Sequence, residues 1–516
     1  MNLDRAALDE LKQLTAEVID DVTLWFLTAD RKYQPDLALA RDLLTQAYGN
    51  APDLVVRRIA LPEEAGGGAA LVVFLDGVVD KEIVDRDIVA PLLRTAWPPG
   101  RWGDRVFWAG AVQSREQWRD LVVDLANGAT LVMSDQDPRV WSLDTSKYPA
   151  RQVSQPQTEL SVRGANEAFS EVGATQLAQL RHRLRDPALR VVSLKIGHRQ
   201  HAPVLVAYLA GVANSDLVQE VLRRLGAVDI DGQISSAQIS GLIRDHPWSI
   251  FPTVRTTERV DLAADALLKG KVAVLVDGDP FVLIVPAVLA DFYLTAMDYT
   301  APWYDTSFVR LIRVVGWAIG VYLPGLYIAL TEVNVNLLPP PLLILTAGNH
   351  AGLPFPPVVE ALLMVFVIEV LREAALRLPQ MLSVTIGTVG AIVVGTAVVR
   401  AGLVSPQMII VITLTALSFY SVPVYELTGT WRLVNFLMLM AGAIVGVYGL
   451  VWISLWLIAT LIGLTSFGVP YFTPMAPFQA RDWRDLFVRA AWPRLGQRPM
   501  STRPQDRTRW ARSGGS

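Results

Sequence analysis

Charged residues are almost absent from one long stretch of this chain. Between Val314 and Ala480 only nine residues are Asp, Glu, Lys or Arg, whereas the 516 residues together carry 46 basic and 49 acidic side chains. Hydrocarbon excludes charge, so a stretch of this kind predicts membrane-spanning helices. The first 275 residues hold most of the charge. The sequence therefore predicts a water-soluble front half followed by a membrane domain.

Several functional classes are excluded by what the sequence lacks. The chain has no cysteine, which rules out disulfides, thiolate metal sites and thiol nucleophiles. It has no phosphate-binding Walker loop, no GxSxG elbow and no HExxH helix. We expect neither an enzyme nor a cofactor or metal site. The formal net charge of −3 gives no reason to expect a nucleic-acid partner.

Comparison of the chain with itself reveals two related pairs of segments. Ala70–Val84 resembles Val204–Val218, and Leu125–Pro138 resembles Leu267–Pro280. Each pair combines an apolar strand with a glycine and acidic residues in step. The pattern predicts two α/β lobes of related plan, with possible internal duplication.

The charge and repeat patterns together divide the chain into seven expected parts. They are a variable N-terminal segment (1–50), a first α/β lobe (51–145), a linker (146–161), a second α/β lobe (162–286), an interfacial helix (287–310), a membrane domain of about four to six helices (311–467) and a basic cytoplasmic tail (468–516).

The stretch VDGDPFVLIVP, residues 276–286, marks the end of the second lobe. Val272–Val276 is a short β-branched run, Asp277-Gly278 is a tight-turn signal, and Phe281–Ile284 is the expected hairpin partner. The apolar run is too short to cross a bilayer, and Pro286 blocks a continuous helix. We expect a hairpin, followed by residues 287–297 lying along the membrane surface.

The expected spans are uncharged segments in the back half, namely Val314–Thr331, Ser383–Val399, Met408–Tyr425 and Leu433–Phe467, the last forming one long helix or two short ones. The proline-rich stretch Glu332–Pro356 is expected to be a re-entrant or surface-lying loop. Arg310 and Arg313 precede the first span, Arg400 follows the second, and nine arginines lie in the tail between residues 481 and 512. If all are cytoplasmic, the number of crossings is even. Four crossings are favoured over six, with both termini in the cytoplasm.

Small residues recur at helical spacing in two of these segments. Gly387, Ala391 and Gly395 follow one another every four residues, and Gly442 and Gly446 form a GxxxG motif. Such stripes let helix backbones approach closely. The pattern fits packing within one chain and also contacts between subunits of a homo-oligomer.

One apolar segment, residues 360–379, carries unusual charge. Glu369 and Glu373 lie four residues apart and share a helix face, and Arg372 is placed to pair with Glu369. Glu360 falls about half a turn from both. Carboxylates in hydrocarbon are costly and should face water, protein or one another. The segment is either the lining of an ion path or an amphipathic helix resting at the interface.

Six further motifs resemble the A subunits of the GerA family of spore germination proteins. The overall resemblance runs from about residue 54 to 477. The motifs follow in family order: TELSVRGANEAFSE (158–171), VDIDGQI (228–234), HPWSIFPTVRTTERVD (246–261), VDGDPFVLIVP (276–286), PFPPVVEALLMVFVIEVLREAALRLP (354–379) and SFGVPYFTPMAP (466–477). In the charged segment, EVLREA stands where the family has an EALREA-like motif.

This resemblance implies a subunit of the spore inner membrane with a two-lobed cytoplasmic domain and several membrane helices. It implies partners, namely a permease-like B subunit, a lipoprotein C subunit and further copies of the chain, and a response to nutrients that opens a monovalent-cation pathway. With the family in view, the small-residue stripes are expected at oligomer contacts. A SpoVAF-like component of the dipicolinate-release machinery, a secondary transporter and a membrane scaffold are the alternatives. The absence of an inverted repeat disfavours the transporter.

Overall fold

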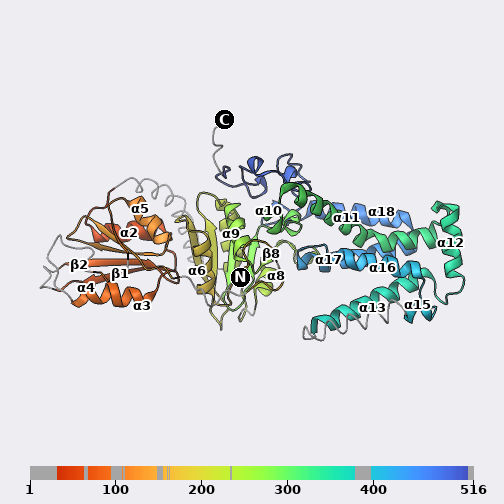
Figure 1. Cartoon of the computed structure of the whole chain (residues 1–516), viewed down its shortest axis with the longest axis horizontal. Coiled ribbons are helices and arrows are strands. Elements are labelled where there is room, and N and C mark those ends of the chain that lie inside the picture. Colours follow the sequence, from red (N-terminus) through yellow and green to blue (C-terminus); the bar gives the residue numbers. More distant parts are fainter. Residues whose placement is uncertain are drawn as a thin grey trace.

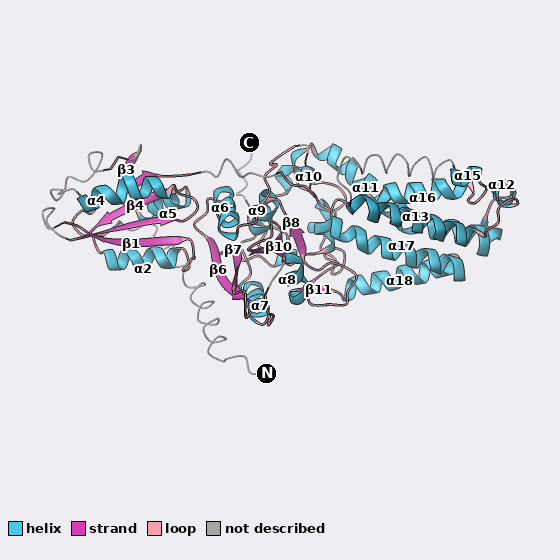
Figure 2. Cartoon of the chain, turned by 90° about the horizontal axis from the view of Figure 1, so that it is seen from below, coloured by secondary structure: helices cyan, strands magenta, loops and turns pink. Residues whose placement is uncertain are grey.

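The structure, a computed structural model, describes residues 32–62, 68–94, 107–108, 111–147, 155–159, 161, 163–232, 235–377 and 397–509. Two α/β lobes and a helical domain follow one another along the long axis of the molecule (Figure 1). Strands are concentrated in the two lobes, and the opposite end of the molecule is helical (Figure 2). The two lobes predicted from the repeated segments are confirmed, and each contains its own five-stranded sheet.

The first lobe is an antiparallel sheet between two helical layers. Its strands lie in the order β1-β2-β4-β5-β3. Helices α2 and α5 pack on one face, and α3, η2 and α4 cover the other. The elements are α2 (Leu37–Ala47), β1 (Leu54–Ala60), β2 (Ala69–Leu75), α3 (Lys81–Ile83), η2 (Val84–Val89), α4 (Ala90–Arg94), β3 (Val112–Arg115), α5 (Trp118–Ala126), β4 (Ala129–Ser134) and β5 (Val140–Asp144).

The second lobe repeats this arrangement element by element. Its sheet has the order β6-β7-β9-β10-β8, which is the same order shifted along the chain, and all its pairs are antiparallel. The elements are α6 (Gly173–Arg183), β6 (Leu189–Ile196), β7 (Ala202–Leu209), α7 (Ser215–Gly226), α8 (Ser236–Ile243), β8 (Arg255–Thr257), α9 (Val260–Leu268), β9 (Val272–Val276) and β10 (Val282–Val285). The shared order supports internal duplication.

The hairpin expected at the end of the second lobe is present. Strands β9 and β10 pair antiparallel, with Leu283 opposite Val274, and Gly278 adopts the positive φ that the turn requires. Both strands are fully buried, because helices cover both faces of the sheet. The apolar run is therefore a core strand.

Helix α2 belongs to the first lobe although it lies within residues 1–50. Asp36 caps it by accepting hydrogen bonds from the backbone N–H groups of Ala38 and Leu39, and Ala40 and Leu44 are fully buried against the sheet. The lobe therefore starts well before residue 51. Sequence self-comparison did not identify α2 because the matched segments begin at β2.

The helical domain consists of seven helices among the described residues. They are α11 (Trp303–Ile328, continued by η4, Ala329–Val333), α12 (Pro340–His350), α13 (Pro357–Arg377), α15 (Val398–Arg400), α16 (Pro406–Phe419), α17 (Tyr425–Val445) and α18 (Val447–Gly463). Two of them, Trp303–Val333 and Tyr425–Val445, are long and apolar enough to cross a bilayer. Helices α16 and α18 are apolar but shorter.

Two expectations for this half are revised, and a third that was left open is settled. Residues 287–310 do not form one helix but a short 3-10 turn (η3, Leu289–Phe292), the one-turn helix α10 (Met297–Thr300) and the start of α11. Pro302 separates α10 from α11 because it lacks the N–H that a continuous helix needs. The stretch expected to be a loop contains α12, whose first turn accommodates Pro340 and Pro341. The last long apolar stretch is two helices, because Gly446 has a φ of +70° and ends α17.

Candidate functional site

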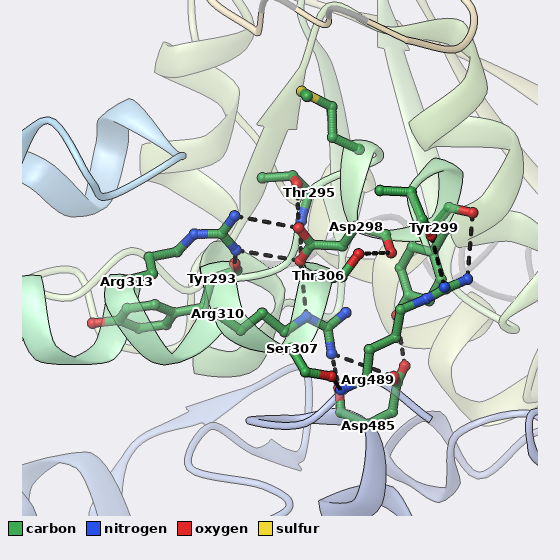
Figure 3. Close-up of polar contacts among 12 residues, drawn as sticks. Tyr293, Thr295, Asp298, Tyr299, Thr306, Ser307, Arg310, Arg313, Asp485 and Arg489 are labelled. Atoms are coloured by element: carbon green, nitrogen blue, oxygen red, sulfur yellow. Dashed lines mark hydrogen bonds and ion pairs between the residues drawn. The ribbon is translucent and has the colours of Figure 1, made fainter. Parts of the chain in front are cut away.

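The centre of the candidate site is Asp298, where the second lobe meets the first long helix. Its side chain is 4% exposed and accepts five hydrogen bonds from three residues. Arg310 Nε lies 3.0 Å from its Oδ2, Arg313 Nη2 lies 3.2 Å from its Oδ1, and Thr295 Oγ1 lies 2.8 Å from its Oδ1. Arg310 and Arg313 are three residues apart and share a face of α11. A single carboxylate thus fixes α11 to α10 (Figure 3).

The C-terminal segment, residues 464–509, completes this joint. Arg310 Nη1 lies 3.3 Å from Asp485 Oδ1, and the hydroxyl of Tyr299 donates to Asp485 Oδ2 at 2.7 Å. Arg489 Nη1 donates to the carbonyl oxygen of Ala301 at 2.9 Å. The joint therefore joins three parts of the chain, which are the end of the second lobe, α11 and the C-terminal segment (Figure 3).

Beyond the joint, the C-terminal segment runs back over the second lobe. Arg498 Nε donates to the carbonyl oxygen of Leu268 at 2.7 Å, and Thr502 Oγ1 donates to that of Lys269 at 2.8 Å. Arg509 pairs with Asp265 at 2.6 Å. The basic tail expected from the sequence is thus a strap against α9. Arg489 and Arg498 are 2% and 9% exposed, because their partners lie on distant segments that local patterns do not reveal.

Burial and charge shift the pKa values of several groups around the joint. Burial alone would raise the pKa of Asp298, but hydrogen bonds and charge from Arg313 and Arg310 outweigh it and lower the pKa. The pKa of Asp265 is also lowered, because Lys269 and Arg509 outweigh its burial. Burial raises the pKa of Tyr299 to about 12. Both carboxylates are therefore ionised at neutral pH, and the joint is held by ion pairs.

The second lobe also holds the start of α17. The hydroxyl of Thr256 on β8 donates to Glu426 Oε1. Thr430 Oγ1 donates to the carbonyl oxygen of Ile250 at 2.5 Å. The rings of Phe251 and Trp431 meet edge to face with centroids 5.6 Å apart. The lobe is thus attached to two long helices by separate contacts, and a movement of the lobe would act on both.

The two lobes are joined by a buried ion pair. Arg181 on α6 places Nε 2.7 Å from Asp53 Oδ2 and Nη2 3.0 Å from Oδ1, with side chains 2% and 6% exposed. The guanidinium also lies over the ring of Tyr48, 5.5 Å from its centroid. A bidentate pair of this kind fixes orientation as well as distance. The first lobe is therefore coupled to the second through a defined contact.

The four charged residues predicted on the apolar segment do not converge at one place. Glu360, at the start of α13, is fully buried. Its Oε2 accepts the backbone N–H of Ser405 at 2.9 Å, and His350 Nδ1 lies 3.2 Å from its Oε1. Glu360 thus joins the end of α12, the start of α13 and the start of α16. A buried carboxylate with these partners organises helix ends.

Glu369 and Glu373 lie further along α13 and are more exposed. The expected pair of Glu369 with Arg372 is present at 3.1 Å, and Arg432 on α17 approaches Glu369 to 2.6 Å. Glu373 pairs with Arg377 at 2.6 Å. The Arg432 contact was missed because it joins helices 63 residues apart in sequence. An ion path along α13 remains a prediction.

The predicted small-residue contacts divide into two groups. Gly387, Ala391 and Gly395 lie outside the described residues. Gly442 packs within the chain, since a Cβ there would lie 2.4 Å from the carbonyl oxygen of Gly325 on α11. Gly446 forms the turn between α17 and α18, where Asn334 Oδ1 accepts the backbone N–H of Val447 at 2.8 Å. Gly442 and Gly446 thus serve packing inside one subunit, and a role in oligomer contacts remains a prediction.

The described residues contain no group of three or more His, Asp or Glu placed to bind a metal. The polar clusters described above are paired internally and connect structural elements. The chain is therefore a two-lobed α/β protein. Its second lobe is attached to the helical domain by hydrogen bonds at α17, and α10, which follows that lobe, is attached to α11 by ion pairs.

Comparison with known proteins identifies the family. The family model described as Bacillus/Clostridium GerA spore germination protein matches residues 42–501. The chain is 32% identical to spore germination protein KA of Bacillus subtilis, over 92% of this chain and 88% of that protein. It is 34% identical to spore germination protein B1 of the same species, over 92% and 99%. The chain belongs to the GerA family of spore germination proteins.

A solved structure also resembles the front half. The N-terminal domain of the A subunit of the Bacillus megaterium spore germinant receptor GerK3 is 29% identical, and the match covers 50% of this chain and 98% of that domain with a TM-score of 0.38.

Proposed function

We propose that this chain is the A subunit of a spore germinant receptor in the spore inner membrane. It oligomerises there and forms or gates a monovalent-cation pathway when nutrients are sensed together with a permease-like B subunit and a lipoprotein C subunit. Membership of the GerA family and the names of its relatives support this role. The observation that carries the gating proposal is the joint at Asp298, where α10, the helix that follows the second lobe, is held to α11.

The arrangement of the helices supports a multi-pass topology. Helix α11 starts at the joint and α17 starts at Tyr425, next to Glu426, which contacts the second lobe. Helix α18 leads back to it, because Ser466 Oγ donates to the carbonyl oxygen of Thr253 at 2.6 Å. Helix α16 ends beside the middle of α11, where Ser421 faces Gly316. Four helices with alternating direction would place both lobes and the C-terminal segment on the cytoplasmic side.

The joint suggests how a signal would reach the pathway. A ligand shifts an equilibrium only if it binds one state more tightly than the other. Nutrient bound by a partner subunit would favour one orientation of the lobes, and the contacts at Asp298 and Glu426 would carry that change to α11 and α17. The carboxylates of α13 are the proposed lining of the pathway.

Cation flux through the reconstituted chain tests this proposal. We expect purified protein in planar bilayers or potassium-loaded vesicles to pass monovalent cations. Glu369→Ala and Glu373→Ala should change the conductance or its selectivity without preventing assembly. Glu220→Ala, on the second lobe, is the matched control and should leave the flux unchanged. A bilayer without current at any protein density would support a scaffold instead, and unchanged flux in both α13 variants would remove them from the pathway.

A further inference from the structure

In the first three turns of α11 the polar face points into the protein and the apolar face points outward, which is the reverse of a helix on the surface of a soluble protein. Thr306, Arg310 and Arg313 point inward and bind the joint. The opposite face is an apolar stripe at helical spacing that no described residue covers, and its members are 51–64% exposed: Tyr304, Phe308, Leu311 and Val315. A water-facing helix shows the opposite arrangement. This stripe therefore requires an apolar environment outside the chain.

The length of α11 places this stripe at the edge of the bilayer. The continuous helix Trp303–Val333 has 31 residues, and at ~1.5 Å per residue it spans roughly 46 Å, against a hydrocarbon core of about 30 Å. The uncharged part, Val314–Thr331, accounts for most of the hydrocarbon thickness. Residues 303–313 then extend into the headgroup region, where amphipathic helices bury their apolar face.

The C-terminal segment runs beside this stripe and adds aromatic side chains. The backbone N–H of Arg489 donates to Ser307 Oγ on α11 at 3.1 Å. The neighbouring part of the segment carries aromatic rings that contact one another, tilted for Phe478 and Trp483 with centroids 5.7 Å apart and edge to face for Trp483 and Phe487 with centroids 5.4 Å apart. Phe478 and Trp483 are exposed. Trp and Tyr concentrate at membrane interfaces because they are apolar with a polar tip.

The charges of the same segment indicate which lipid is bound. Arg481, Arg484 and Arg494 are exposed, and no ion pair joins them to the part of the chain that the structure describes. This contrasts with Arg489, which lies in the same segment but is buried at the joint. Unpaired arginines next to exposed aromatic rings at the end of a membrane helix match a surface of anionic phospholipid headgroups.

We infer that residues 303–315 and 478–494 form a lipid-docking collar that binds anionic phospholipid at the cytoplasmic face of the bilayer. The inference rests on the proposed membrane location of the helical domain. It adds a partner, the acidic lipid headgroup, and a role for the C-terminal segment, which holds the joint at a fixed depth relative to the membrane. A second copy of the chain is the competing occupant of the apolar stripe.

Site-directed spin labelling tests the stripe, and the absence of native cysteine makes single labels specific. The full chain carrying Phe308→Cys is reconstituted in vesicles of phosphatidylglycerol and phosphatidylcholine. We expect the label to be more accessible to oxygen than to a water-soluble nickel reagent. Leu39→Cys, at a 47% exposed position on the first lobe, should show the reverse. Trp452→Cys, 71% exposed on α18, reports whether the helices are in lipid at all.

These labels separate the two proposals. A lipid-exposed label at position 452 with a water-exposed label at position 308 would overturn the collar and leave the membrane location intact. Water exposure at both positions would overturn both. Spin–spin broadening at position 308 with low accessibility to both reagents would assign the stripe to a second copy of the chain.

Brominated lipids test the choice of headgroup. The collar's tryptophan fluorescence is the part of the signal that is lost in Trp483→Phe. We expect brominated phosphatidylglycerol to quench this part more strongly than brominated phosphatidylcholine does. The variant carries Arg481→Gln, Arg484→Gln and Arg494→Gln, and its preference for phosphatidylglycerol over phosphatidylcholine should fall about five-fold for each arginine removed. In the unmodified chain this preference should also weaken as the salt concentration rises. Arg41→Gln, Arg58→Gln and Arg119→Gln, on the exposed surface of the first lobe, form the control. Equal quenching by both lipids, or displacement by inorganic phosphate, would overturn a lipid-specific site.

Discussion

Gly325 on α11 and Gly442 on α17 meet backbone to backbone. The Cβ that Gly442 lacks would lie 2.4 Å from the carbonyl oxygen of Gly325, and the one that Gly325 lacks would lie 2.6 Å from the carbonyl oxygen of Met438. Neither contact can be relieved by rotating a side chain, because both partners are backbone atoms. The closest approach of the two long helices therefore depends on these two glycines.

Gly442→Ala should destabilise the helical domain. The added methyl group forces the two helices apart, and overpacking of this kind costs about 1–3 kcal/mol. Thermal unfolding of the purified chain in detergent measures the change. Gly348→Ala, on α12 where nothing lies within 4 Å of the added Cβ, is the control and should be neutral or slightly stabilising. Equal effects of the two changes would contradict a packing role for Gly442.

Arg181→Met should loosen the contact between the lobes. It leaves the carboxylate of Asp53 buried without its partner, and breaking one side of a buried pair costs about 3–5 kcal/mol. The exposed pair of Arg57 with Asp85 provides the comparison, since Arg57→Met should change stability by less than about 1 kcal/mol. Denaturant unfolding and proteolysis between the lobes measure both variants. Similar midpoints for the two would show that the buried pair contributes little.

The joint should weaken in acid. A carboxyl group whose pKa is lower in the folded chain stabilises the fold above its ordinary pKa of 3.8, and that stabilisation is lost as the pH falls through 3.8 toward the folded value. Asp298→Asn should therefore flatten the dependence of the melting temperature on pH below about pH 5. Asp42→Asn, exposed on α2, should leave the curve unchanged. Parallel curves for wild type and Asp298→Asn would contradict this assignment.

Glu360→Ala should destabilise the chain more than Glu373→Ala. Removal of the Glu360 side chain leaves the buried backbone N–H of Ser405 without an acceptor, at a cost of about 1–3 kcal/mol. Glu360→Gln keeps an acceptor oxygen and should have a smaller effect. Glu373 is 61% exposed, so its replacement should be close to neutral. Thermal unfolding of the three variants checks the order, and a Glu360→Ala variant as stable as Glu373→Ala would contradict it.

The sequence predicted the lobes well because their information is local. Alternating apolar strands, the Asp277-Gly278 turn and the repeated segments are short-range patterns, and the β9–β10 hairpin and the two equal sheets confirm them. The pairing of Glu369 with Arg372 was also local and is present.

Long-range partners could not be predicted in the same way. The burial of Arg489 at the joint depends on backbone atoms 188 residues away, and Arg432 reaches Glu369 across 63 residues. The basic composition of the tail fits a tail that lies free beside the membrane and equally one that packs against the second lobe. Only the fold brings Asp485 next to Arg310 and so distinguishes the two arrangements.

The two lobes contact different parts of the chain. Among the described residues, polar contacts from the first lobe to other parts of the chain reach the second lobe, as in the bidentate pair of Arg181 with Asp53, whereas the second lobe holds both long helices. A protein bound to the first lobe would therefore act on the helices through the contacts between the two lobes. A partner bound to the first lobe would leave the contacts of α11 and α17 untouched, and only a movement of the second lobe would reach both helices.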